Sequence, residues 1–105
     1  GWSWLMAEAG SIDVQVRFFN VLAIYAGTKR LTLTVPAGTS LRDCLDRLAT
    51  TSPEAFRRAL VKEGQLTPYL RVFRNEKLTV GAALEQPVAD GDQLMLFPAV
   101  AGGQF

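Results

Sequence analysis

The sequence predicts an α+β domain in which a mixed sheet of about four to five strands has one main helix packed across it. Two early segments alternate between apolar and polar residues, as strands with one buried face do. An apolar stripe with helical spacing follows, and then two further strand-like segments. The expected order of elements is therefore β-β-α-(α)-β-β.

The first two strands are expected over residues 12–18 and 31–35. Apolar residues occupy every second position in the first segment, and threonines alternate with leucine and valine in the second until Pro36 ends it. We expect the two segments to pair as an antiparallel hairpin with a long connection.

The main helix is expected over residues 41–49, with Thr39 or Ser40 as its cap. A shorter helix is expected next, with Ser52 as its cap and Pro53 at its first position, ending at Gly64. The apolar stripe that predicts the main helix consists of Leu41, Cys44, Leu45 and Leu48. Its cysteine is therefore expected to be a small core residue rather than a reactive thiol.

The later strands are expected over residues 69–75 and 93–97. A turn should follow the first of them, and Asp90-Gly91 is a tight-turn signal before the second. Between them, residues 82–84 form a brief apolar contact. We divide the chain into a leader (1–11, of which 1–5 resemble an expression remnant), a domain (12–98) and a flexible tail (99–105).

The composition excludes several kinds of chemistry. The 105 residues include one cysteine and no histidine, so an intrachain disulfide, a Cys/His metal site and a histidine-based catalytic triad are all excluded. The formal net charge of +1 and the scattered basic residues do not favour binding to nucleic acid or to an anionic membrane. We therefore expect a substrate or carrier protein and not an enzyme, with no metal site.

Several motifs together resemble a known family. They are Val16-Arg17-Phe18-Phe19, Ala26-Gly27, Thr39-Ser40-Leu41, Arg74-Asn75, Leu84-Glu85-Gln86-Pro87-Val88, Asp90-Gly91-Asp92 and the stretch from Leu96 to Gly103. This sequence resembles the MoaD/ThiS-type sulfur carriers of the ubiquitin-like β-grasp fold over about residues 13–103. The ending Phe-Pro-x-Val-x-Gly-Gly is the most specific part of the resemblance.

The resemblance implies a role for the tail. The last strand should lie parallel to the first, and the carboxylate of Gly103 should be adenylated by an E1-like enzyme and converted to a thiocarboxylate. Val100, Ala101 and Gly102 would be recognised in the enzyme's channel, where glycine avoids side-chain clashes. The partner would use ATP and a sulfur donor, a downstream synthase would accept the sulfur, and this chain would bind no stable cofactor. Such a protein is expected in the cytoplasm.

One feature departs from the typical carrier. Gln104 and Phe105 follow Gly103, so the carboxylate of Gly103 must first be released. Some members of the family are trimmed by a JAMM-type metallopeptidase, and we expect cleavage of the Gly103–Gln104 bond here.

The alternatives are a ubiquitin-like modifier joined to lysines through Gly103, a non-catalytic β-grasp interaction domain, and the small subunit of a molybdopterin synthase. Phe97 and Phe19 are candidates for partner contact, although aromatic residues also occupy cores. For Phe18 we prefer the core position.

Overall fold

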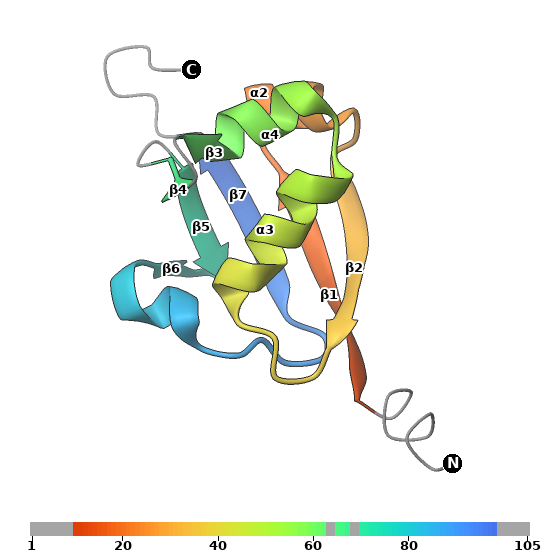
Figure 1. The fold of residues 1–105 in the computed structure, drawn as a ribbon, viewed down its shortest axis with the longest axis vertical. Coiled ribbons are helices and arrows are strands. Elements are labelled where there is room, and N and C mark those ends of the chain that lie inside the picture. Colours follow the sequence, from red (N-terminus) through yellow and green to blue (C-terminus); the bar gives the residue numbers. More distant parts are fainter. Residues whose placement is uncertain (1–9, 63–64, 68–69, 99–105) are drawn as a thin grey trace.

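A five-stranded mixed sheet carries helix α3 across one face in the computed structural model, which describes residues 10–62, 65–67 and 70–98 (Figure 1). The strand order is β2-β1-β7-β5-β6. The α+β prediction is therefore confirmed. The strands of this sheet are β1 (Ser11–Phe18), β2 (Arg30–Pro36), β5 (Leu70–Arg74), β6 (Lys77–Thr79) and β7 (Gln93–Pro98).

The first and last strands occupy the middle of the sheet. Strand β1 pairs antiparallel with β2, with Val14 opposite Leu33, as the alternation predicts. On its other side β1 pairs parallel with β7, with Val16 opposite Leu94. The parallel pairing implied by the family resemblance is confirmed, and β7 becomes a central strand with neighbours on both sides.

The later part of the chain contains short elements that the pattern did not predict. Strand β5 turns through Asn75 and Glu76, which both have positive φ, into the three-residue strand β6. Strands β3 (Val61–Lys62) and β4 (Gln65–Leu66) form a separate two-stranded sheet. The apolar contact expected at 82–84 lies in the 3-10 helix η1 (Gly81–Glu85). Strands of two or three residues are too short to show an alternating pattern.

Helix α3 (Leu41–Thr51) begins at the residue predicted for it and extends slightly further. The hydroxyl oxygen of Ser40 accepts a hydrogen bond from the Asp43 N–H at 3.1 Å and caps the helix. Thr39 instead donates its hydroxyl proton to the Pro36 carbonyl. Cys44 is fully buried, and this burial raises the pKa of its thiol. Its prediction as a core residue is confirmed.

Helix α4 (Glu54–Leu60) starts one residue later than predicted. Pro53 is the N-cap and not the first helical residue, because its ψ of 152° is extended while its φ of −54° suits a helix. Pro53 has no side-chain hydroxyl, and the cap makes no side-chain hydrogen bond, so the prediction that Ser52 caps this helix is wrong. The predicted end at Gly64 lies outside the described residues.

Helix α2 (Val21–Ala26) was not predicted. It has only six residues, and its N-cap Asn20 makes no side-chain capping bond. Gly27 ends it in the left-handed conformation, with φ of 78°. The helix is too short to show a helical period, so its signals in the sequence are limited to Asn20 before it and Gly27 after it.

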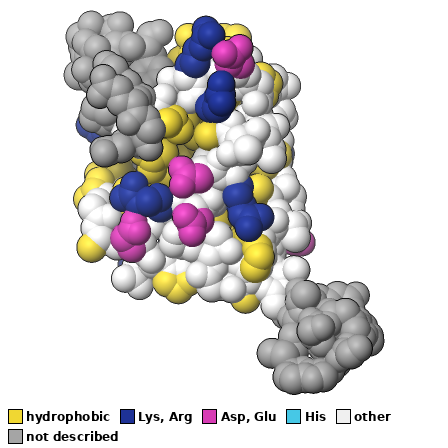
Figure 2. Space-filling view, in the orientation of Figure 1, with side chains coloured by type: hydrophobic (Ala, Val, Ile, Leu, Met, Phe, Trp, Pro, Cys, Tyr) yellow, Lys and Arg dark blue, Asp and Glu magenta, His cyan; other side chains and the backbone are white. Residues whose placement is uncertain are grey.

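The core lies between the sheet and the helices. Phe18 packs edge-on against Phe56, with ring centroids 5.0 Å apart, so its core assignment is confirmed. Figure 2 shows the helix side of the molecule, where basic and acidic side chains are interspersed on the surface. In the described segments, no helix is long and apolar enough to cross a membrane. The fully buried side chains include Val14, Val16, Leu22, Val35, Leu41, Leu45, Leu48, Leu60, Leu94 and Leu96.

Candidate functional site

The predicted reactive segment begins where strand β7 ends. Val100, Ala101, Gly102, Gly103, Gln104 and Phe105 lie outside the described residues, so the structure gives the geometry of the attachment point alone. That attachment point is Pro98, which is buried at the end of β7.

Strand β7 divides its side chains between the two faces of the sheet. Leu94, Leu96 and Pro98 are buried toward the helices, whereas Met95 and Phe97 are half-buried on the opposite, open face. The strand is paired on both sides, with Leu96 opposite Phe18 of β1 and opposite Val72 of β5. Two ladders of backbone hydrogen bonds therefore fix the position from which the tail starts.

An aromatic patch of Phe19, Phe73 and Phe97 occupies the open face near this point. The rings of Phe19 and Phe97 are stacked, with centroids 4.1 Å apart and planes at 11°. Phe73 meets Phe97 edge-on at 5.4 Å, and the guanidinium of Arg17 lies 5.2 Å from the centroid of Phe19. The two partner-contact candidates from the sequence are thus in direct contact with each other.

Phe73 was not among the candidates. Its position in β5 is opposite Met95 of β7, which places both side chains on the open face. The alternation in the predicted strand 69–75 indicates which face of the sheet Phe73 occupies. Its contact with Phe97 follows only from the register in which β5 pairs with β7.

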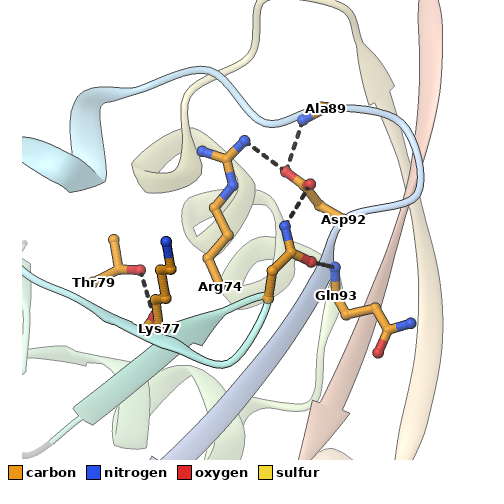
Figure 3. A network of polar contacts seen from close by, with 7 residues as sticks. Arg74, Lys77, Thr79, Ala89, Asp92 and Gln93 are labelled. Carbon is orange, nitrogen blue, oxygen red and sulfur yellow. Dashed lines mark hydrogen bonds and ion pairs between the residues drawn. The ribbon is translucent and has the colours of Figure 1, made fainter.

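A polar network fixes the other end of β7 (Figure 3). Asp92 accepts hydrogen bonds from the Ala89 N–H at 2.8 Å and the Asn75 side-chain amide at 2.9 Å, and it forms an ion pair with Arg74 at 2.8 Å. Asn75 also accepts a hydrogen bond from the Gln93 N–H at 2.9 Å. The β5–β6 turn is thereby joined to the start of β7.

The network also determines the charge state of Asp92. Burial alone would raise the pKa of this carboxyl group, but hydrogen bonds from Ala89 and Asn75 and the nearby charge of Arg74 hold its pKa below the ordinary value. Asp92 is therefore ionised at neutral pH. The motifs Arg74-Asn75 and Asp90-Gly91-Asp92 were noted in the sequence, but their mutual contact depends on the fold.

The described ranges contain no group of three or more Cys, Asp or Glu side chains placed to hold a metal ion. The geometry instead shows a strand, β7, that is paired on both sides and ends close to an apolar surface. This arrangement suits a protein whose tail is handled by another protein.

Comparison with known proteins gives consistent results. The model of the ThiS family matches residues 16–103. Small archaeal modifier protein 1 of Haloferax volcanii is 34% identical over 87 residues, covering 83% of this chain and 97% of that protein.

Solved structures extend the comparison to the fold. A crystal structure of SAMP1 from Haloferax volcanii is similar with a TM-score of 0.73 and 33% identity, over 87% of this chain and 99% of that one. The crystal structure of the BexX/CysO complex of Amycolatopsis orientalis is similar with a TM-score of 0.59 and 32% identity, over 86% and 99%. This chain therefore belongs to the ThiS family, and it is a ThiS/MoaD-type protein with the ubiquitin-like β-grasp fold.

Proposed function

We propose that this protein is a sulfur carrier in which Gly103 bears the sulfur as a thiocarboxylate. The observation that carries the proposal is the family match, which runs along the tail up to Gly103. The tail starts from a central strand that two neighbours hold in place, so it extends from a fixed base. The six residues from Pro98 to Gly103 span at most about 20 Å when extended, which reaches into an enzyme pocket.

The proposed chemistry has three steps. A JAMM-type metallopeptidase uses water to hydrolyse the Gly103–Gln104 bond and releases the Gln-Phe dipeptide. A carboxylate oxygen of Gly103 then attacks the α-phosphate of ATP in an E1-like enzyme, pyrophosphate leaves, and an acyl-adenylate forms. Finally, a hydrosulfide donor attacks the carbonyl carbon, AMP leaves, and loss of a proton gives the thiocarboxylate.

In this role the protein is a cosubstrate that other enzymes act upon. Its own contribution is strand β7, paired on both sides, and the aromatic patch near the end of that strand. Stacked aromatic side chains at the surface provide the type of anchor that protein interfaces use. The similar CysO protein forms a complex with BexX, which supports docking of this fold onto another protein.

Intact-mass measurement tests the proposal. The chain is incubated with the metallopeptidase and the E1-like enzyme of its own genome, ATP and sodium sulfide. The expected result is loss of the Gln-Phe dipeptide followed by exchange of one oxygen for sulfur. An unchanged mass with both enzymes active on a known carrier would refute the proposal.

A second candidate is a protein modifier, favoured by the similarity to small archaeal modifier protein 1. This function needs the same activated Gly103 but ends in an isopeptide bond to a lysine. Proteolytic digestion of cell extract followed by mass spectrometry distinguishes the two. Lysine peptides that carry the tail ending in Gly103 support modification, and their absence beside a detectable thiocarboxylate supports the carrier alone.

A further inference from the structure

A pocket of about 360 Å³ lies beside the aromatic patch, between the end of β1, helix α2 and the start of β2. Its exposed apolar group is Ile24, with 76% of the residue accessible to solvent. A side chain so exposed takes little part in the core, and its position in the pocket lining leaves it available to an inserted group. The lining residues are Arg17, Phe18, Phe19, Asn20, Ala23, Ile24, Lys29 and Arg30.

Three of these lining residues are basic, and none is acidic. Arg17, Lys29 and Arg30 form no ion pair with any of the described residues, whereas Arg42 and Arg74 are each paired with a carboxylate. Arg17 and Arg30 are directly opposite in the β1–β2 register. Like charges in that position destabilise a sheet, so the pairing of Arg17 with Arg30 does not stabilise the fold.

The pocket lies at the end of the sheet from which the tail starts. Strands β1 and β7 run parallel, with Phe18 opposite Leu96, and the Phe19 N–H donates a hydrogen bond to the Leu96 carbonyl at 3.0 Å. Phe19 belongs both to the pocket lining and to the aromatic patch. A protein that holds the tail against the patch therefore also covers the pocket.

We propose that this pocket receives an aliphatic or aromatic side chain flanked by Asp or Glu residues on the enzyme that adenylates the tail. The inference rests on the proposed function and names the chemistry of the partner surface. Carboxylates there neutralise Arg17, Lys29 and Arg30, and complementary charge speeds association at low salt. The inserted apolar side chain covers Ile24.

The same residues do not favour a nucleic acid. Phe19 already stacks on Phe97 and contacts Arg17, and the exposed apolar group of the pocket is the aliphatic Ile24. An aliphatic side chain offers no ring on which a base can stack. A polypeptide that combines carboxylates with an apolar side chain matches both features.

The test uses the chain ending at Gly103 and the purified E1-like enzyme of the same genome, with ATP–pyrophosphate exchange as the readout. The Lys29→Glu/Arg30→Glu variant should raise the KM for the carrier at least tenfold with kcat unchanged. Added salt should weaken binding of the wild type, and this salt dependence should be absent in the variant. Ile24→Asp should raise the KM similarly. The matched control is Arg47→Glu/Lys77→Glu, which changes charge by the same amount at two exposed positions outside the pocket and should leave the KM near that of the wild type.

The charge reversal is not expected to unfold the protein, because it removes the repulsion between Arg17 and Arg30. An unchanged KM in both pocket variants overturns the inference while adenylation of the wild type still supports the proposed function. If the wild type is not adenylated, the proposed function fails, and calorimetric titration of the same variants into the nucleotide-free enzyme tests the pocket. The inference is overturned if the wild type and the variants bind the enzyme equally, or if none of them binds. It is also overturned if they bind a labelled single-stranded RNA in a charge-dependent way and do not bind the enzyme.

Discussion

At the scale of single residues, Asp92 joins the turn before β7 to the end of β5 and the β5–β6 turn. Its carboxylate is bonded to Ala89 in the preceding turn, to Asn75 in the β5–β6 turn and to Arg74 at the end of β5. Only 8% of its side chain is exposed, so water does not readily replace these partners. Asp92 therefore holds the start of β7 against the β5–β6 turn, at the end of the strand opposite to the tail.

Replacing Asp92 with asparagine should lower the free energy of unfolding at pH 7 by about 1.5–3 kcal/mol, the range for hydrogen bonds to charged groups. The amide keeps the shape but loses the ion pair with Arg74. Urea denaturation followed by circular dichroism measures the change. Asp46→Asn is the control, because Asp46 is exposed on helix α3 and should cost less than about 0.5 kcal/mol.

The same residue predicts a pH dependence. The pKa of Asp92 is lower in the folded protein than in the unfolded chain, so its stabilising effect is complete above the ordinary aspartate pKa of about 3.9 and is lost as the pH falls through the lower folded value. The difference in unfolding free energy between the wild type and Asp92→Asn should therefore shrink as the pH falls below about 4. A difference that grows toward acid would contradict the assignment.

At the scale of elements, helix α3 supplies a continuous buried face to the core, made of Leu41, Cys44, Leu45, Leu48 and Ala49. Leu45 of α3 is fully buried. Leu45→Ala should lower the free energy of unfolding by about 2–5 kcal/mol, since it removes apolar contacts and leaves a cavity. Chemical denaturation measures this change in the free energy of unfolding. A decrease well below about 2 kcal/mol would mean that this helix face does not pack on the sheet as described.

The aromatic patch predicts a different response. Phe97→Ala should lower the free energy of unfolding by about 1–3 kcal/mol, because Phe97 is only half-buried, yet weaken binding to the activating enzyme at least tenfold. Titration calorimetry at a temperature where the variant is fully folded measures the affinity. Leu78→Ala removes an exposed side chain of the edge strand β6 and should leave binding nearly unchanged.

The sequence predicted the elements whose patterns are local and long. Strand β1 and helix α3 show their periodicity over seven or more residues, and both were placed within a few residues of their observed bounds. Helix α2 and strand β6 are too short to show a period, and they exist because the rest of the fold holds them. The contact of Phe73 with Phe97 and that of Arg74 with Asp92 depend on pairing between distant segments, which no local pattern contains.

At the scale of the whole molecule, the fold places three features near one end of the sheet. These are the start of the tail after Pro98, the aromatic patch, and the basic pocket around Ile24. The parallel pairing of β1 with β7 brings them together, because both strands end on the same side. A single partner surface can therefore engage the patch and the pocket while it takes the tail.

The central claim is that the carbonyl carbon of Gly103 is the reactive atom, and chains truncated at adjacent residues test it most directly. A chain ending at Gly103 and one ending at Gly102 are each incubated with the activating enzyme, ATP and sodium sulfide, and their intact masses are measured. We predict that only the chain ending at Gly103 exchanges one oxygen for sulfur, with fragmentation placing the sulfur on its last residue. Sulfur on neither chain, or on both equally, would contradict this account.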